Sequence, residues 1–192
     1  MTEGRRIPLP LDRAAREELR AGERLLLSGT LFTVRDRAHR RLLESLRAGE
    51  PLPVELEGAT LYYAGPSPAP PGKAAGSLGP TTSARMDAFT PALAAEGVAA
   101  FIGKGPRSLE ARRALRGHGA LYLVAVGGAG ALLGSRVKAL EVAAYPDLGP
   151  EAIYRLEVED FPVLVACDLR GGYIFSHLDG EEEGDTPGGG MV

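Results

Sequence analysis

The sequence lacks several common residue types. Its 192 residues include no asparagine, no glutamine, no tryptophan and a single cysteine, Cys167. One cysteine excludes an internal disulfide, and it excludes a zinc or iron–sulfur site made from this chain's thiolates alone, which would need about three or four. Arginine (19) far outnumbers lysine (3). The missing thermolabile amides fit a thermophilic source, and a GC-rich genome is the alternative reason for so much arginine.

Long hydrophobic runs and an excess of positive charge are also missing. The uncharged run at residues 119–134 has sixteen residues and is shorter than the roughly 20 needed to cross a membrane. The N-terminus has no apolar segment typical of a secretory signal, so we expect a cytoplasmic protein that does not enter a membrane. The net charge is −3 and no basic stripe with aromatic residues is present, which disfavours nucleic-acid binding.

The pattern of apolar residues predicts an α/β domain. A hydrophobic content of 44% and a charged content of 24% are typical of a soluble globular chain. Strands are expected to alternate with helices in the first two thirds of the chain: strands at 6–11, 25–34, 61–64, 98–102 and 121–126, and helices at 12–20, 36–48, 87–96 and 108–117. The alternation from residue 98 to 136 predicts a βαβ unit with a parallel pair of strands.

After residue 137 the pattern changes to short strands with little room for helices between them. These strands are expected at 140–144, 153–158, 163–168 and 173–175. The expected fold class is therefore α/β, a mixed sheet with a parallel βαβ core and a second, short-stranded β-layer. We expect one domain over residues 1–178, and the acidic, glycine-rich segment 179–192 has no periodicity and is predicted to be a disordered tail.

One stretch, residues 76–87 (GSLGPTTSARMD), is unusually rich in residues with special backbone or chemical roles. Gly79 and Pro80 are expected to fix an unusual backbone path. Three hydroxyl residues follow, any of which can be the N-cap of a helix, and Arg85 then lies in the first turn. A helix N-terminus beside a guanidinium can bind a carboxylate or a phosphate. The alternative is a capped helix after a tight turn, with no ligand.

Three cations share a context that indicates a ligand. Arg35 follows the strand at 25–34, Lys104 lies in a Gly-Lys-Gly loop after the strand at 98–102, and Arg85 lies in the central stretch. Parallel strand ends are where α/β proteins bind ligands. If the three converge, they suit a small dicarboxylate. Thr81 or Thr82 would then be the candidate proton-transfer group, and it would need strong local activation.

Other motifs have simpler interpretations. Asp36 and His39 are three residues apart at a strand-to-helix junction, where they can pair on one helical face as a cap and an exposed salt bridge. Two apparent phosphate loops, at 97–104 and 128–134, have the wrong spacing for a P-loop or a dinucleotide fingerprint, so we reject nucleotide binding. Cys167 lies in an apolar strand and is expected to be a buried, inert thiol.

Segments across the whole chain resemble one family. The run YYAGPSPAPPGKAAGSLGPTTSARMDAFTP, with RDRAH before it and IGKG after it, is similar to the β subunit of two-subunit class I fumarases and L-tartrate dehydratases, and to the C-terminal domain of single-chain class I fumarases. Further matches are the opening IPL…LRAGERLLLSGTLFTVRD, VAVGGAGALL and YPDLGPEAIYRLEVEDFPVLVACD, and together they extend the resemblance over roughly residues 5–175. The chain is thereby identified as a member of this family.

The resemblance implies a function and partners. It implies a swivel-type domain of sheets and helices in a hydro-lyase that reversibly hydrates fumarate to L-malate, with a small dicarboxylate as substrate. It implies an oxygen-sensitive [4Fe–4S] cluster bound by a partner α subunit and not by this chain, which agrees with the single cysteine. The assembly implied contains two α and two β subunits.

The resemblance also implies roles for single residues. The first threonine of GPTT, Thr81, matches the family's proposed catalytic base, and the ligands of the substrate carboxylates fall on Arg35, Arg85 and Lys104. Four other residues of the same motifs are expected to support these groups: Asp36, His39, Gly79 and Thr82. Asp36 and His39 are expected to do so by orienting Arg35 or the domain contact. No metal ligand is expected in this chain.

Two alternatives stay open at this point. An L-tartrate dehydratase β subunit would have the same motifs, because much of the pocket that meets the extra hydroxyl would belong to the α chain. A non-catalytic module on the same fold is the second alternative. The intact set of Thr81, Arg85, Arg35 and Lys104 argues against it, since a module without catalysis has no physical need for that set.

Overall fold

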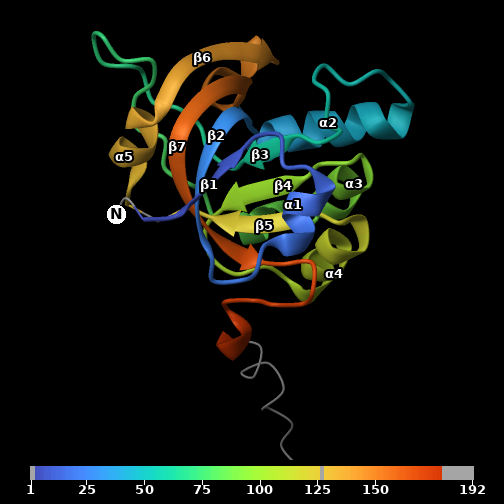
Figure 1. The fold of residues 1–192 in the computed structure, drawn as a ribbon. Coiled ribbons are helices and arrows are strands. Elements are labelled where there is room, and N and C mark those ends of the chain that lie inside the picture. Colours follow the sequence, from blue (N-terminus) through green and yellow to red (C-terminus); the bar gives the residue numbers. More distant parts are fainter. Residues whose placement is uncertain (1–2, 126–127, 179–192) are drawn as a thin grey trace, which may run out of the picture.

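One mixed sheet organises the chain, and it closes on itself (Figure 1). The computed structural model describes residues 3–125 and 128–178. Within these ranges the strands are Arg5–Pro8 (β1), Arg24–Thr33 (β2), Thr60–Tyr62 (β3), Ala100–Gly103 (β4), Leu121–Val124 (β5), Val137–Ala144 (β6) and Ile153–Cys167 (β7). Their order is β1-β2-β3-β4-β5-β7-β6, and β2 also pairs with β7. Strands β2, β3, β4, β5 and β7 therefore form a closed, barrel-like ring.

Strand direction confirms the expected mixed sheet. Strands β1 to β5 run parallel to their neighbours among themselves, whereas β7 is antiparallel to β2, β5 and β6. The βαβ unit predicted between residues 98 and 136 is present as β4, α4 (Leu109–His118) and the parallel strand β5. The carboxyl ends of four parallel strands, β2 to β5, consequently lie at one end of the sheet.

Five helices and three 3-10 turns occur in the described ranges. They are Arg13–Glu18 (α1), Asp36–Ala48 (α2), Thr90–Ala95 (α3), α4 and Gly130–Ser135 (α5), with 3-10 turns at Ser83–Met86 (η1), Pro146–Glu151 (η2) and Ser176–Leu178 (η3). Local signals set several of their ends. Asp12 and Ser108 cap α1 and α4 as predicted, because each side chain accepts a hydrogen bond from the backbone N–H three residues later. Gly49 ends α2 with a φ of 66°.

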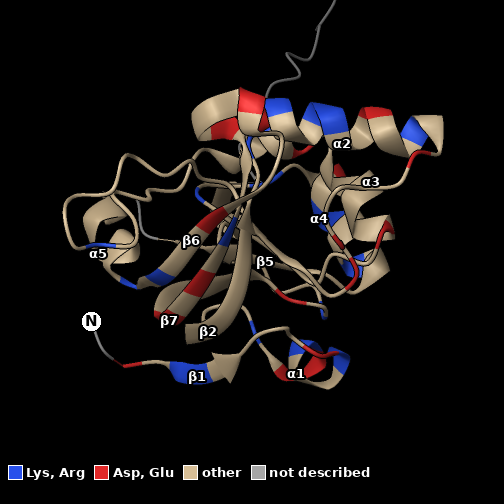
Figure 2. Ribbon diagram, turned by 90° about the horizontal axis from the view of Figure 1, so that it is seen from above, with Lys and Arg blue, Asp and Glu red and all other residues tan. Residues whose placement is uncertain are grey.

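Two hydrophobic clusters lie on the two sides of the strands. Strand residues alternate between them, so that Tyr62 and Ile102 belong to the cluster inside the ring while Leu61 and Phe101 belong to the cluster under the helices. The second cluster packs α2, α3 and α4 against the outer face (Figure 2). Both faces of the parallel strands are therefore buried, which is why their sequences read as continuous apolar runs.

The C-terminal half differs from the expected second β-layer. The segments 153–158 and 163–168 form one fifteen-residue strand, β7, in the same sheet. A bulge lies between them, where Asp160 has a φ of 50° and its N–H bonds to Ser28 Oγ at 3.0 Å. The break in hydrophobic pattern at this bulge resembles a strand end in the sequence.

Two smaller expectations need correction, and a third concerns residues that the structure does not describe. The helix expected at 87–96 begins only at Thr90, after the separate turn η1. Residues 173–175 form no strand, although Tyr173 makes an isolated bridge with Cys167. The predicted tail, 179–192, lies outside the described residues.

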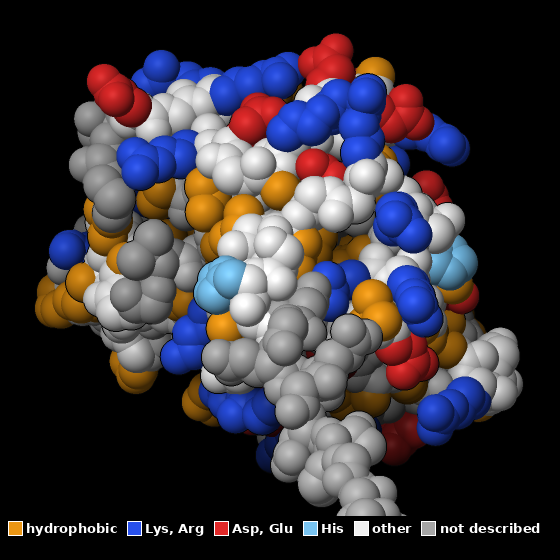
Figure 3. Space-filling model, turned by 90° about the horizontal axis from the view of Figure 1, so that it is seen from below, with side chains coloured by type: hydrophobic (Ala, Val, Ile, Leu, Met, Phe, Trp, Pro, Cys, Tyr) orange, Lys and Arg blue, Asp and Glu red, His pale blue; other side chains and the backbone are white. Residues whose placement is uncertain are grey.

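Charged groups are mixed over the surface. Basic and acidic residues both occur along α2 (Figure 2), and on the face seen from below Lys and Arg side chains are spread out rather than gathered in one patch (Figure 3). No helix in the described ranges has the length and apolar character required to cross a membrane.

Candidate functional site

The candidate site residues lie where parallel strands end. The chain leaves β3 at Tyr63, whose carbonyl oxygen accepts a hydrogen bond from the backbone N–H of Thr81 at 2.7 Å. It leaves β4 at Lys104, whose carbonyl oxygen accepts one from the backbone N–H of Ser83 at 3.0 Å, and Thr82 and Lys104 form an isolated parallel bridge. The central stretch is thus attached to the ends of two strands that are neighbours in the sheet.

A direct contact joins Thr81 to Arg85. Arg85 Nη2 donates to Thr81 Oγ1 at 2.8 Å and to Asp36 Oδ2 at 3.1 Å. Asp36 is the first residue of α2, where the positive end of the helix dipole attracts a negatively charged side chain. The arginine side chain is half exposed, at 51%. The structure therefore brings together a hydroxyl, a guanidinium and a carboxylate on an open surface.

The turn that holds these residues is not the capped α-helix considered from the sequence. It is the four-residue 3-10 helix η1, and its N-cap residue, Thr82, makes no side-chain capping bond. The hydroxyl groups have other partners: Thr81 Oγ1 accepts from Arg85, and Ser83 Oγ accepts from Tyr122 OH at 2.8 Å. An anion at this turn would therefore meet side chains rather than the N-terminus of an α-helix.

Arg35 points toward a different partner. Its Nη2 lies 3.5 Å from Glu151 Oε1, and the other carboxylate oxygen of Glu151 accepts from the backbone N–H of Arg37 at 3.3 Å. Gly65 leaves room for this arginine, since a Cβ there would lie 3.1 Å from Arg35 Cδ. Arg35 Nε is buried and has no hydrogen-bond partner among the described residues. A polar atom in that state is a position at which a ligand or a partner chain can bond.

His39 supports Arg35 through the backbone, and it does not pair with Asp36. Its Nδ1 lies 2.9 Å from the carbonyl oxygen of Arg35, so Nδ1 carries the proton. The ring is fully buried between Phe89 and Tyr63. Burial lowers the pKa of His39 to about 4, which keeps the imidazole neutral.

The remaining predicted residues are exposed. Lys104, Thr82 and Gly79 all lie at the surface, and Lys104 is linked to the cluster through its backbone rather than its side chain. Gly79 lies against α5: a Cβ added to Gly79 would lie 3.8 Å from the Cα of Gly130. The structure thus joins Thr81, Arg85 and Asp36 by hydrogen bonds, and in the described ranges no side-chain hydrogen bond or ion pair links Arg35 or Lys104 to these three.

Glycines allow the segments around the site to approach closely. A Cβ on Gly103 would lie 1.9 Å from Ser83 Oγ, and a Cβ on Gly134 would lie 1.9 Å from the carbonyl oxygen of Gly76. The glycine-rich run 128–134, which fails as a dinucleotide fingerprint, therefore serves to pack α5 against the central stretch.

Sequence reasoning missed a buried ion pair behind the site. Arg107 Nε donates to Asp87 Oδ1 at 2.5 Å, and the arginine side chain is completely buried. Burial alone would lower the pKa of Arg107, but the interactions with Tyr63, Asp87 and Tyr122 together with the hydrogen bond to Asp87 raise it overall, so the guanidinium stays charged. The ion pair could have been suspected from the positions of its two residues in the sequence, because Asp87 ends the central stretch and Arg107 follows the Gly-Lys-Gly loop.

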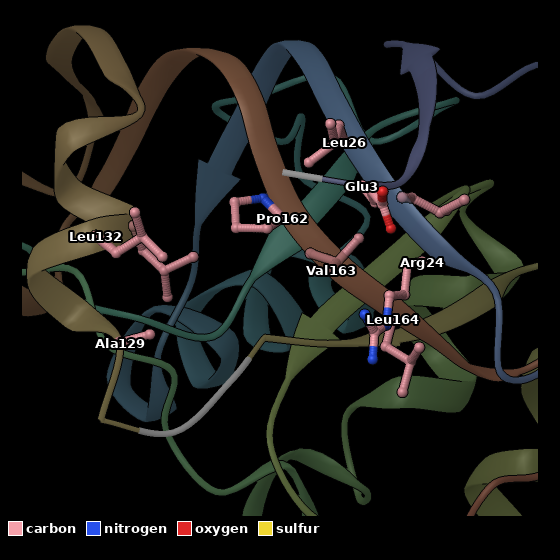
Figure 4. A pocket seen from close by; sticks show the side chains of 10 residues that line it. Glu3, Arg24, Leu26, Ala129, Leu132, Pro162, Val163 and Leu164 are labelled. Atoms are coloured by element: carbon pink, nitrogen blue, oxygen red, sulfur yellow. The ribbon is translucent and has the colours of Figure 1, made fainter. Parts of the chain in front are cut away.

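An apolar pocket lies elsewhere on the barrel (Figure 4). Its volume is about 190 Å³, and it is bounded by β2, by β7 around Pro162 and by α5 with Leu132. None of the candidate site residues lines it. Its mainly aliphatic wall does not suit a dicarboxylate.

Comparison with known proteins decides the family. The family model described as Fumarase C-terminus matches residues 3–178. The chain belongs to this family. It is 40% identical over 184 residues to "Fumarate hydratase class I, aerobic" of Escherichia coli (strain K12), a match that covers 92% of this chain and 34% of that protein. The chain therefore spans about a third of the length of the fumarate hydratases it matches.

Two smaller relatives are matched over most of their length. One is "Putative L(+)-tartrate dehydratase subunit beta" of Methanocaldococcus jannaschii (strain ATCC 43067 / DSM 2661 / JAL-1 / JCM 10045 / NBRC 100440), 36% identical over 169 residues that cover 85% of this chain and 87% of that one. The other is "L(+)-tartrate dehydratase subunit beta" of Escherichia coli (strain K12), 32% identical over 165 residues that cover 83% of this chain and 81% of that one. This member of the fumarase C-terminal family is thus similar in extent to relatives named as separate subunits.

Proposed function

We propose that this chain is the β subunit of an iron–sulfur hydro-lyase that reversibly hydrates fumarate to L-malate. The observation that carries the proposal is the hydrogen bond from Arg85 to Thr81 Oγ1, made beside Asp36 and the Lys104 loop. Membership of the fumarase C-terminal family and similarity to fumarate hydratases and tartrate dehydratase β subunits support it. The thermophilic origin and the assembly of two α and two β subunits belong to the same proposal.

The residues of this chain can bind the substrate and transfer a proton. Arg35, Arg85 and Lys104 supply cations for the two carboxylates, and a guanidinium can bind a carboxylate through two hydrogen bonds. In the hydration direction, the oxygen of a water molecule bonds to C2 of fumarate as the double bond opens, the Thr81 hydroxyl delivers its proton to C3, and the proton released from the water restores the hydroxyl. The N–H of Arg85 that points at Thr81 Oγ1 stabilises the negative charge left on that oxygen. This contact supplies part of the activation that a threonine hydroxyl needs, because its ordinary pKa is far from neutral.

The chain's own residues do not fit an iron–sulfur cluster. Such a cluster needs about three or four cysteine ligands. Cys167 is buried in β7, and burial raises the pKa of its thiol to about 12, which disfavours the thiolate that binds iron. No group of three His, Cys, Asp or Glu side chains suited to a metal ion occurs in the part of the chain that the structure describes. We propose that a partner α subunit holds the [4Fe–4S] cluster and completes the site over the open surface.

The test is anaerobic co-expression with the candidate α chain, followed by assays with fumarate, L-malate and L-tartrate side by side. We expect fumarate and L-malate to interconvert only when both chains are present. Turnover of L-tartrate alone would replace the substrate assignment with the second candidate, an L-tartrate dehydratase, which the match to two tartrate dehydratase β subunits favours. A complex that holds a cluster and converts none of the three would contradict both.

A further inference from the structure

Two loops carry the proposed catalytic and binding groups, and one buried ion pair joins them. Asp87 lies two residues after Arg85, and Arg107 lies three residues after Lys104. The side chain of Arg107 is 0% exposed and that of Asp87 is 14% exposed. The arginine Nε and the Asp87 Oδ1 are 2.5 Å apart, so the two loops are fixed to each other below the surface that would meet substrate.

The contacts of Arg107 extend to the groups that hold Thr81. Its guanidinium carbon lies 5.5 Å from the ring centre of Tyr63 and 4.9 Å from that of Tyr122. Tyr63 is the residue whose carbonyl oxygen accepts the N–H of Thr81 at 2.7 Å. Tyr122 OH makes 2.8 Å contacts with Ser83 Oγ in one loop and the carbonyl oxygen of Gly105 in the other. Arg107 therefore packs against Tyr63 and Tyr122, two residues that hydrogen-bond to the central stretch.

Both residues of the ion pair make further hydrogen bonds. The second carboxylate oxygen of Asp87 accepts the backbone N–H of Ser108 at 2.7 Å, and Tyr173 OH accepts the backbone N–H of Arg107 at 2.9 Å. Arg107 Nη2 also donates to Thr90 Oγ1 in α3. Arg107 Nη1 lies 3.5 Å from Tyr63 OH, so the three nitrogens of the guanidinium contact three different residues, which a lysine with a single ammonium group cannot reproduce.

We propose that Arg107 and Asp87 are positioning residues, which fix Thr81 and Arg85 relative to Lys104 and so set the rate of proton transfer without contacting substrate. The inference rests on the function proposed above. Its physical basis is that a displacement of about 1 Å at a catalytic group can reduce the rate about 100-fold.

Kinetics of the reconstituted two-chain complex test this proposal. Arg107→Lys and Asp87→Asn are compared with Arg16→Lys, a matched substitution at the other end of the sheet, where Arg16 Nη1 donates to the carbonyl oxygen of Gly119 before β5. Leu19→Ala, in the core near α1, is the control for lost stability. At a temperature where all variants are folded by circular dichroism, we expect kcat to fall about 100-fold for Arg107→Lys and to stay within about twofold for both controls.

Two kinetic results would contradict the positioning role of Arg107. An Arg107→Lys complex with kcat within about twofold of wild type would overturn the positioning role, as would an equal loss of kcat in Leu19→Ala. Amide hydrogen exchange of the full-length chain gives a readout that needs no substrate. We expect the Ser83 N–H, which bonds to Lys104, to exchange at least about tenfold faster in Arg107→Lys and at the wild-type rate in Arg16→Lys.

Exchange and kinetics separate the two proposals. If the wild-type complex converts no dicarboxylate, the proposed function fails, and an unchanged Ser83 exchange rate in Arg107→Lys still overturns the positioning role. If the wild-type complex is active and exchange at Ser83 is unchanged, the positioning role alone fails.

Discussion

Gly103→Ala is predicted to damage the site by pushing two elements apart. Gly103 ends β4, and an added Cβ would lie 1.9 Å from Ser83 Oγ and 2.8 Å from Tyr63 Cδ2. Both neighbours are fixed, because Ser83 Oγ bonds to Tyr122 OH and Tyr63 is fully buried. Overpacking of this kind typically costs about 1–3 kcal/mol. For a chain of this length that corresponds to a melting temperature lower by about 2–12 °C.

Activity should fall with stability in this variant. The turn η1 must move away from β4 to admit the methyl group, and Thr81 and Arg85 lie at and beside that turn. We expect kcat of the two-chain complex to drop about 100-fold for a shift near 1 Å. Gly117→Ala is the matched control: nothing lies within 4 Å of its added Cβ, so alanine in α4 should stabilise by up to about 1 kcal/mol. A Gly103→Ala variant with the melting temperature and kcat of wild type would refute the steric argument.

The remaining predictions concern titration, reactivity and heat. Because the pKa of buried His39 is lowered from 6.5 to about 4, its neutral form stabilises the fold above about pH 6.5, and roughly 3 kcal/mol is lost as the pH falls toward 4. Urea unfolding of His39→Leu should show a flatter pH dependence over that range, and an unchanged slope would contradict the burial argument. Cys167 should resist thiol reagents at pH 8 until the chain unfolds, since its pKa is raised to about 12, and rapid labelling of folded protein would contradict this. The thermophilic hypothesis predicts a melting temperature above about 60 °C for the assembled complex, and calorimetry that finds a lower value would remove it.

Local signals made much of the fold predictable. The caps at Asp12 and Ser108 and the end of α2 at Gly49 depend on neighbouring residues only, so the sequence is enough to place them. The βαβ unit follows from alternating apolar patterns in the same way. The continuity of β7 was not predictable, because it depends on a bulge at Asp160 that forms only when the distant strand β2 pairs with it.

The candidate site likewise combines one contact between residues close in the sequence with contacts that depend on the tertiary fold. Thr81 and Arg85 are four residues apart, and their contact is a local one within a single turn. The pairing of Arg85 with Asp36 joins residues 49 positions apart, and it replaces the expected pairing of Asp36 with His39. The ion pair of Asp87 with Arg107 likewise depends on the tertiary fold, since only the adjacency of β3 and β4 brings the two loops together.

The most direct test of the account is the turnover of Thr81→Ala in the reconstituted complex, with Thr81→Ser as the control that retains Oγ. Arg85 donates to this oxygen at 2.8 Å, so its removal should abolish the proton transfer while the cations still bind the carboxylates. We expect kcat to fall about 100- to 10,000-fold with KM changed only a few-fold, and Thr81→Ser to recover much of the loss. A Thr81→Ala complex that hydrates fumarate with a kcat near wild type would contradict the central claim.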